Sequence, residues 1–169
     1  MDDAARWFRA FLDAAGLADD PELAGTPERV TELLASFAPK PLPAPSICAT
    51  ASSTPVVIRG IPFHSLCAHH LLPFFGEVSV AYRPEGRLLG LGSVPRLVAH
   101  FARRTQIQER MAEQIADGLA GWAAPVALAV AVRARHLCVE MRGTPAPVEV
   151  TVIATRGEPD AWLRSQVER

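Results

Sequence analysis

The spacing of apolar residues divides the chain into a helical N-terminal part and a longer part that mixes helices with strands. Residues 3–15 carry apolar side chains at helical spacing, and Gly16 follows them as a stop signal. A second helix is predicted from Thr26-Pro27, because a hydroxyl residue followed by proline is typical of a helix start. The two apolar stripes are Trp7, Phe8, Phe11, Leu12 and Ala15, then Val30, Leu33, Leu34 and Phe37.

A proline-rich segment follows these helices. Residues 38–45 contain four prolines, which favours a linker over packed structure. We therefore expect a helical segment with its linker over residues 1–45. Residues 46–169 are then long enough to form one main domain with a core of its own.

The main domain begins with segments that favour strands. Residues 56–58 are all β-branched, and residues 77–83 alternate, with Val78, Val80 and Tyr82 on one face. A turn over residues 84–87 is predicted to lead into a short return strand over 88–91.

Two helices and two strands are predicted next. The first helix buries Val94, Leu97, Val98 and Phe101, and the second buries Ile107, Met111, Ile115 and Leu119. Thr105 is expected to cap the second helix, with Gln108 completing a capping box. A long strand over residues 126–138, another over 148–152 and a terminal helix over 160–167 complete the chain.

The order of these elements indicates the fold class. Helices come first, followed by a β-β-α-α-β-β series, which is typical of an α+β fold. In such a fold the helices cover one face of an antiparallel sheet.

Composition excludes several classes of protein. The chain is 49% hydrophobic with a formal charge of −1, so it fits a soluble globular protein without the basic excess of a nucleic-acid partner. Its apolar runs fall far short of the roughly 20 residues of a membrane helix. The N-terminus lacks the pattern of a signal peptide, so we expect a cytoplasmic protein with reduced thiols. Its three cysteines then form no disulfide framework, and Cys48 is interpreted as a small buried apolar residue.

The candidate chemistry starts at Cys67-Ala68-His69-His70. This stretch places one thiol and two imidazoles within four residues, between apolar segments that exclude water. Sulfur and nitrogen donors at close spacing suit zinc, but one such cluster does not fill a coordination shell.

The missing donor is sought at His136-Leu137-Cys138. If the strand over 126–138 continues to its end, His136 and Cys138 point to the same side, because side chains two apart share a face. Cys67, His70 and Cys138 then make a set of three ligands and leave a fourth position for water. Zinc with such an open position lowers the pKa of its water to about 7. His69 and His136 remain beside the metal as proton carriers. The alternative is that these cysteines and histidines are ordinary buried residues.

Three stretches of the sequence together resemble the GTP cyclohydrolase I family. They are residues 65–76 (SLCAHHLLPFFG), residues 101–104 with 106–110 (FARR, QIQER), and residues 136–138 with 141–143 (HLC, MRG). The resemblance covers about residues 56–143, most of the main domain.

The resemblance implies a role for each matching residue. The zinc ligands of the family fall on Cys67, His70 and Cys138, and its catalytic histidines on His69 and His136.

The guanine-recognising pair of the family falls on Gln108 and Glu109. A carboxylate suits the two adjacent donors of guanine, N1–H and the exocyclic amine. The alternative for this pair is a solvated helix start. The phosphate-binding arginines implied by the family are Arg96, Arg142 and Arg29.

The resemblance also implies a reaction and an assembly. Water attacks C8 of GTP, the imidazole ring opens to a formamide, and a second hydrolysis releases formate. The ribose then rearranges and closes a six-membered ring, which gives 7,8-dihydroneopterin triphosphate, a product of pterin and tetrahydrofolate biosynthesis. The implied fold is the tunnelling fold, whose units join side by side in rings. Two rings of five subunits form a homodecamer with active sites between subunits.

Some positions depart from the family pattern. Ala68 replaces the usual glutamate, Glu32 replaces a lysine, and Gly92-Ser93 replaces a Ser-Lys pair. Each lost lysine–phosphate contact removes about 1.5–3 kcal/mol of binding free energy. Other cations of a neighbouring chain are candidate replacements, namely Arg59, Arg103, Arg104 and Lys40.

Two other functions fit the same departures. The first is a specialised paralogue that acts on a less phosphorylated guanine nucleotide or stops after ring opening. The second is a zinc-containing ring that binds purines or pterins without turnover. The presence of every residue needed for ring opening argues against the second.

Overall fold

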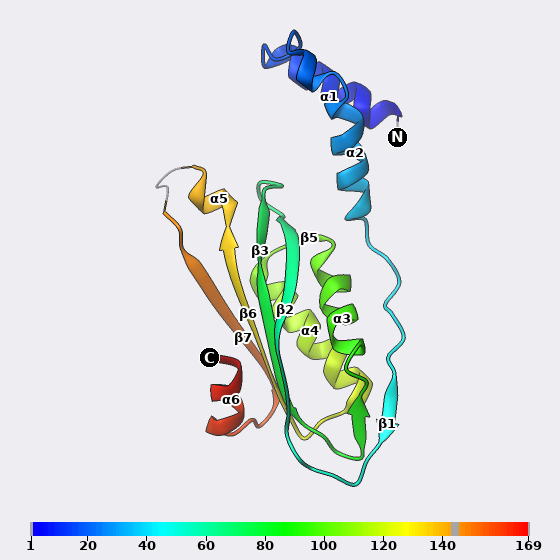
Figure 1. Cartoon of the computed structure of the whole chain (residues 1–169), viewed down its shortest axis with the longest axis vertical. Coiled ribbons are helices and arrows are strands. Elements are labelled where there is room, and N and C mark those ends of the chain that lie inside the picture. Colours follow the sequence, from blue (N-terminus) through cyan, green and yellow to red (C-terminus); the bar gives the residue numbers. More distant parts are fainter. Residues whose placement is uncertain (1, 143–145, 169) are drawn as a thin grey trace. The chain divides into compact units, whose positions relative to one another are not determined.

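The structure of the chain is a computed structural model that describes residues 2–142 and 146–168. It divides into two compact units between Pro39 and Lys40, inside the proline-rich segment (Figure 1). Each unit is described by itself. Within the described residues, no helix is both long enough and apolar enough to span a membrane.

The first unit is a pair of helices, as the apolar spacing predicts. Helix α1 covers Asp2–Ala14 and α2 covers Thr26–Ser36, with a short 3-10 turn, η1, at Pro21–Leu23. Gly25 rather than Thr26 occupies the N-cap of α2. Leu12 is buried, whereas Trp7 and Phe11 are 71% and 59% exposed. Much of the predicted apolar stripe of α1 therefore has no cover within this unit.

The second unit is built on a five-stranded sheet in the order β5-β2-β3-β6-β7. The strands are β2 Val56–Cys67, β3 Pro73–Arg83, β5 Thr105–Gln106, β6 Ala127–His136 and β7 Glu149–Gly157. The four long strands are antiparallel to their neighbours, and only the short β5 is parallel to β2.

Two short strands form a separate sheet. Strand β1, Ile47–Ala49, pairs with β4, Arg87–Leu89. The predicted return strand therefore pairs with the segment after the linker and not with the strand before it. The buried Tyr82 hydroxyl accepts a hydrogen bond from the Leu89 backbone N–H at 3.2 Å, which ties β4 to the end of β3.

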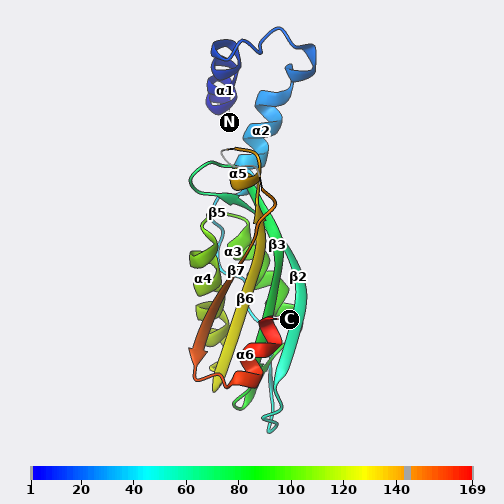
Figure 2. The same cartoon turned by 90° about the vertical axis from the view of Figure 1, so that its left-hand side faces the viewer.

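Helices α3, Ser93–Ala102, and α4, Gln108–Ala123, cover one face of the sheet, as predicted (Figure 1). The side chains of Leu128, Val130 and Val132 on β6 face these helices and join the main core. The terminal helix α6, Ala161–Glu168, packs on the opposite face (Figure 2). There Leu163 and Val167 lie against Ala81, Ala129 and Ala131, whose small side chains leave room for the helix.

Two local predictions near the sheet end are wrong. Thr105 does not cap a helix, because it belongs to β5 and α4 begins at Gln108 without a side-chain cap. The strand predicted over residues 126–138 ends at His136, where a single helical turn, α5, covers Leu137–Glu140. Both changes occur where the chain forms the candidate site.

Candidate metal centre and active site

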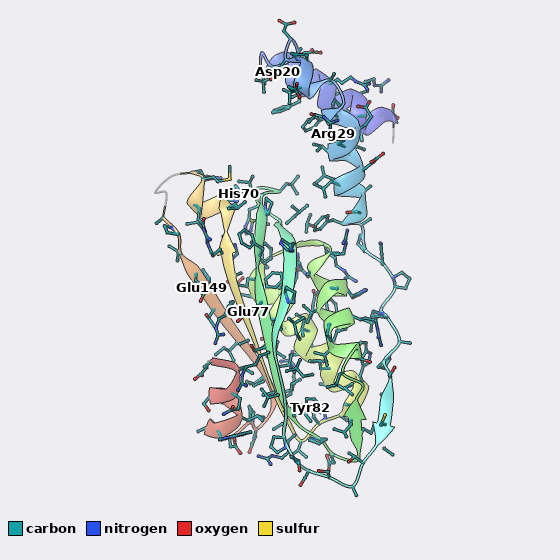
Figure 3. The ribbon with its side chains drawn as sticks, viewed as in Figure 1. Asp20, Arg29, His70, Glu77, Tyr82 and Glu149 are labelled. Atoms are coloured by element: carbon teal, nitrogen blue, oxygen red, sulfur yellow. The ribbon has the colours of Figure 1, made fainter. Side chains whose placement is uncertain are left out.

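Cys67 is the last residue of β2, and a tight turn returns the chain to β3. The Cys67 backbone N–H donates to the Leu72 carbonyl at 2.8 Å, and the Leu71 N–H donates to the Cys67 carbonyl at 2.8 Å. Leu71 has a φ of +55°, a left-handed conformation that is unfavourable for a residue with a side chain. Such strain is characteristic of functional sites, and here it occurs in the turn that carries His70 (Figure 3).

Cys138 reaches the same place by a route that differs from the strand prediction. It lies in α5, so its direction is set by a helical turn and not by strand alternation. The ligand atoms of Cys67, His70 and Cys138 nevertheless lie within 4.8 Å of one another. The three residues thus come together although one reason given for Cys138 was incorrect.

The spacing of these atoms fits a zinc ion. Zn–S bonds of about 2.3 Å and Zn–N bonds of about 2.0–2.1 Å in a tetrahedron place sulfur and nitrogen about 3.6 Å apart. The Cys67 Sγ and His70 Nδ1 atoms are 3.6 Å apart. Burial, together with the adjacent Cys67 thiol, raises the pKa of Cys138 above its ordinary value. Two adjacent thiolates are therefore unfavourable unless a cation neutralises them. This donor set is suited to binding such a cation.

His69 lies at the exposed side of this cluster. Its Nδ1 atom is 3.9 Å from the Cys67 sulfur, slightly farther than that of His70, and the two imidazole rings stand edge to face with centroids 6.1 Å apart. Because His69 is exposed, its ring can exchange protons with solvent while remaining beside the cluster.

His136 is held from two sides. Its ring stacks on the buried ring of Phe74 with centroids 4.8 Å apart and planes 1° apart. Its Nε2 atom lies 2.7 Å from the side-chain oxygen of Gln108. The Gln108 amide group donates to the Val132 and Val150 carbonyls, at 2.8 and 2.9 Å. In that orientation the Gln108 oxygen can only accept a hydrogen bond from His136. The His136 ring therefore carries its proton on Nε2 and its lone pair on Nδ1.

Burial lowers the pKa of His136 below its ordinary value, although the charges of Glu109 and Glu140 oppose the shift. His136 is therefore a neutral base at pH 7, with its lone pair on Nδ1.

This arrangement changes the role predicted for Gln108. The residue is 2% exposed, and its side-chain nitrogen and oxygen are both occupied within the chain. Its neighbour Glu109 is exposed at the start of α4, and its charge is close enough to act on the pKa of His136 by raising it. The guanine contact predicted for the pair stays a prediction for the exposed Glu109 carboxylate, whereas the Gln108 side chain positions His136. The sequence does not reveal this contact, because it depends on the packing of α4 against β6 and β7.

The predicted phosphate-binding arginines lie in different places. Arg96 is exposed on α3 and donates to the Ser93 hydroxyl at 3.1 Å. Arg142 is exposed after α5, and its charge opposes the rise in the pKa of Cys138. Arg29 belongs to α2 in the first unit, where it donates to Thr26 Oγ1 and the Glu22 carbonyl at 3.2 and 3.4 Å. Its part in the site stays a prediction.

These features define a tunnelling-fold protein with a candidate Cys2His metal centre. A likeness of the fold is found in the crystal structure of the archaeosine synthase QueF-like protein in its apo form. It covers 66% of this chain and all of that one, with a TM-score of 0.52 and 23% identity, so the likeness concerns the fold alone.

Sequence comparison identifies the family. The family model described as GTP cyclohydrolase I matches residues 4–167. GTP cyclohydrolase 1 of Campylobacter concisus is 44% identical over 136 residues, which cover 75% of this chain and 72% of the relative. GTP cyclohydrolase 1 of Hyperthermus butylicus is 41% identical over 170 aligned positions, which cover 95% of this chain and 86% of the relative. The chain belongs to the GTP cyclohydrolase I family and is an enzyme of that type.

Proposed function

We propose that this protein is a zinc-dependent hydrolase that converts GTP to 7,8-dihydroneopterin triphosphate and releases formate from C8 of the guanine. The observation that carries the proposal is the convergence of Cys67, His70 and Cys138 within 4.8 Å, with His69 beside them. Membership of the GTP cyclohydrolase I family supports the same reaction.

The metal part of the proposal rests on the donor set. Cys67, His70 and Cys138 would hold the zinc through two sulfurs and one imidazole nitrogen, which leaves a tetrahedral ion one open position. When bound, zinc acts as a Lewis acid that lowers the pKa of a water molecule to about 7. The Cys67 thiol is buried and belongs to the main core, whereas His70 is exposed on the side open to a substrate.

The proton transfers are assigned to the two remaining histidines. His136 presents a neutral ring whose orientation is set by Gln108 and Phe74, so its Nδ1 can accept a proton from the attacking water. His69 is exposed and can deliver a proton to the opening imidazole ring of the substrate. The Glu109 carboxylate accepts hydrogen bonds from N1–H and the exocyclic amine of guanine, which orients C8.

A second candidate function is favoured by one observation at the phosphate end. Ser93, which stands where a lysine is expected, is 1% exposed, and its hydroxyl accepts from the Ser46 backbone N–H at 2.8 Å. It is therefore not available to a phosphate, and Glu32 adds a negative charge at the other lysine position. A specialised enzyme that takes a less phosphorylated guanine nucleotide, or stops after ring opening, accounts for both changes.

We also propose a cytoplasmic homo-oligomer, with a decamer as the expected form. Strand β5 pairs with only Leu66 and Cys67 of β2, which leaves most of that edge of β2 without a partner in the described chain. Strand β7 ends the sheet on the other side. Long open edges are unfavourable in isolation, and pairing β2 of one subunit with β7 of the next closes them.

The experiment that tests the substrate is turnover of GTP, GDP, GMP and guanosine by zinc-loaded protein, with the products separated by chromatography. Fluorescent neopterin from GTP, seen after oxidation and dephosphorylation, is the expected result. Preferential turnover of GMP would support the second candidate. Binding of guanine nucleotides without any formate would contradict both and indicate a non-catalytic zinc-containing ring.

A further inference from the structure

The helical turn α5 carries a candidate metal ligand, although it has little to stabilise it locally. It follows β6 directly, covers Leu137–Glu140 and includes Cys138 (Figure 1). Starting a helix is unfavourable, so four residues on their own do not stay helical in water. The turn has no side-chain hydrogen bond at its N-cap and contains no buried residue. Its conformation therefore depends on contacts with other parts of the chain.

An ion pair between Arg135 and Glu140 closes this turn onto strand β6. The Arg135 Nε and Nη2 atoms donate to the two carboxylate oxygens of Glu140, at 2.9 and 2.6 Å. Two parallel hydrogen bonds of this kind fix the direction of both side chains, which a single contact does not. Arg135 belongs to β6, and Glu140 is the last residue of α5. The pair therefore spans the turn, and Cys138 lies between its two ends.

The Arg135 guanidinium is held in turn by a row of rings on the sheet. Its Cζ atom lies 5.9 Å from the centre of the Phe75 ring, and the Phe75 ring stacks on that of His64 with centroids 5.9 Å apart. Phe75 is the cross-strand partner of both residues. A guanidinium is attracted to the face of an aromatic ring. The row therefore connects α5 to strands β6, β3 and β2.

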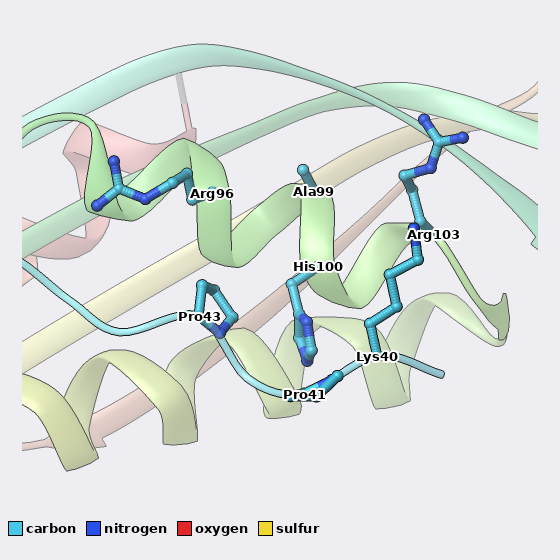
Figure 4. Close-up of a pocket in the computed structure, with 7 residues that line it drawn as sticks. All are labelled: Lys40, Pro41, Pro43, Arg96, Ala99, His100 and Arg103. Atoms are coloured by element: carbon cyan, nitrogen blue, oxygen red, sulfur yellow. The ribbon is translucent and has the colours of Figure 1, made fainter. Parts of the chain in front are cut away.

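This pairing distinguishes Arg135 from the arginines predicted to bind phosphate. Arg96 lines a pocket on α3 together with Lys40 and His100, and the described lining of that pocket includes no carboxylate (Figure 4). The Arg135 guanidinium, in contrast, already has two of its nitrogens on a carboxylate. Arg135 is therefore better suited to holding α5 than to binding an anionic substrate.

We propose that Arg135 and Glu140 are positioning residues of the metal centre, because their ion pair fixes α5 and with it the Cys138 sulfur. The inference rests on the zinc site of the proposed function but not on turnover of GTP. A preformed site binds its metal more tightly, because α5 then needs no further ordering when the ion binds. Loss of the contacts behind a metal ligand typically lowers the affinity for the metal about 10–100-fold.

An effect of charge alone would give a different result. Arg135 is a cation beside a cation site, so its removal would strengthen zinc binding if only Coulomb forces acted, whereas removal of Glu140 would weaken it. Positioning instead predicts weaker binding in both variants. Because the two residues act as a pair, the double variant should lose no more affinity than either single variant does.

The test is the zinc affinity of the full chain, measured by competition with a chromophoric chelator in Arg135→Ala, Glu140→Ala and the double variant. We expect zinc binding about 10–100-fold weaker in all three. Arg83→Ala is the matched control, because it breaks an ion pair with Asp160 at the opposite end of the sheet, and it should leave the affinity unchanged. Unchanged affinity in the pair variants, opposite changes in the two single variants, or additive losses in the double variant would overturn the proposal.

Cobalt(II) in place of zinc reports on the sulfur ligands directly. Its sulfur-to-metal charge-transfer absorption should fall in Arg135→Ala, because Cys138 is then held less well, and should stay unchanged in Arg83→Ala. Arg135→Lys should recover part of the zinc affinity, since an ammonium group keeps the charge but not the two parallel hydrogen bonds.

Hydrogen exchange in the metal-free protein tests the ion pair without zinc. The Met141 backbone N–H donates to the Leu137 carbonyl at 2.9 Å and so reports on α5. Exchange of this N–H should be faster in Arg135→Ala than in the parent protein or in Arg83→Ala. Equal exchange in all three would overturn the positioning role. A parent chain that binds no zinc would refute the proposed function, whereas the exchange measurement still decides whether the ion pair holds α5.

Discussion

The three candidate ligands act as one unit, and Cys138 is the member that joins them from a distant part of the chain. Cys138→Ser is expected to lose zinc and turnover together, because a hydroxyl replaces a thiolate in a set that has only three protein ligands. Metal content by atomic absorption and formate release measure the two effects. Cys48→Ser is the control, since Cys48 lies on β1 outside the cluster and is exposed, so its predicted burial is wrong. Retention of stoichiometric zinc by Cys138→Ser would refute the ligand assignment.

Gln108 and Glu109 are neighbours with different expected roles. Gln108→Ala should lower kcat about 10–100-fold and leave KM nearly unchanged, because it frees the His136 ring while the substrate contacts remain. Glu109→Ala should chiefly raise KM for guanine nucleotides.

Nitrogen NMR of the imidazole rings provides a second measurement for the same prediction. The Nε2–H tautomer of His136 should dominate in the parent protein and lose its dominance in Gln108→Ala. A rise in KM alone in that variant would instead indicate that Gln108 contacts the substrate.

At the scale of elements, the amino-acid pattern accounts for most of the fold. Apolar spacing predicts α1, α2, α3 and α4, and alternation predicts β3, β6 and β7, because each of these elements is long enough to show its period. Two of the short elements, β5 and α5, were not predicted. Strand β5 has two residues and α5 has four, so neither is long enough to show a period, and both are held by contacts with distant parts of the chain.

The same limit applies to the site. The residue types and their spacing marked Cys67 and His70 as candidate ligands, because soft donors are unusual in an apolar setting. Cys138 was added from a strand alternation that does not hold, since the strand ends at His136. The contact between Gln108 and His136 was not predictable, since it depends on where α4 begins. The strand pairing that places Phe74 opposite His136 was likewise not readable from the sequence.

The pairing of β3 with β6 depends on Gly76. A Cβ atom at this position would lie 1.9 Å from the Arg133 carbonyl oxygen and 2.9 Å from Ala134 Cα, both of them backbone atoms that cannot move aside. Gly76→Ala should therefore reduce the free energy of unfolding by about 1–3 kcal/mol or more, measured by urea denaturation. Gly121→Ala is the control, because Gly121 lies in α4 with nothing within 4 Å of the added atom. It should leave stability unchanged or raise it by up to about 1 kcal/mol. Equal stability of the two variants would contradict the account.

At the scale of the whole molecule, the open sheet edges predict that the chain does not function alone. Sedimentation equilibrium should give a mass several times the 18.2 kDa of one chain, with about tenfold expected for the decamer. The exposed Trp7 and Phe11 on α1 offer further apolar surface for such contacts. A mass of one chain at micromolar concentration, in a protein that still turns over substrate, would contradict the assembly.

The proposed zinc-dependent hydrolysis of guanine nucleotides depends on the cluster of Cys67, His70 and Cys138. It is tested most directly by quantifying formate released from GTP by the zinc-loaded protein, by the protein stripped of metal, and by zinc-loaded His136→Ala. We expect catalytic formate release by the first, none by the second until zinc is restored, and retained zinc without turnover for the third. Equal formate release with and without zinc would contradict it.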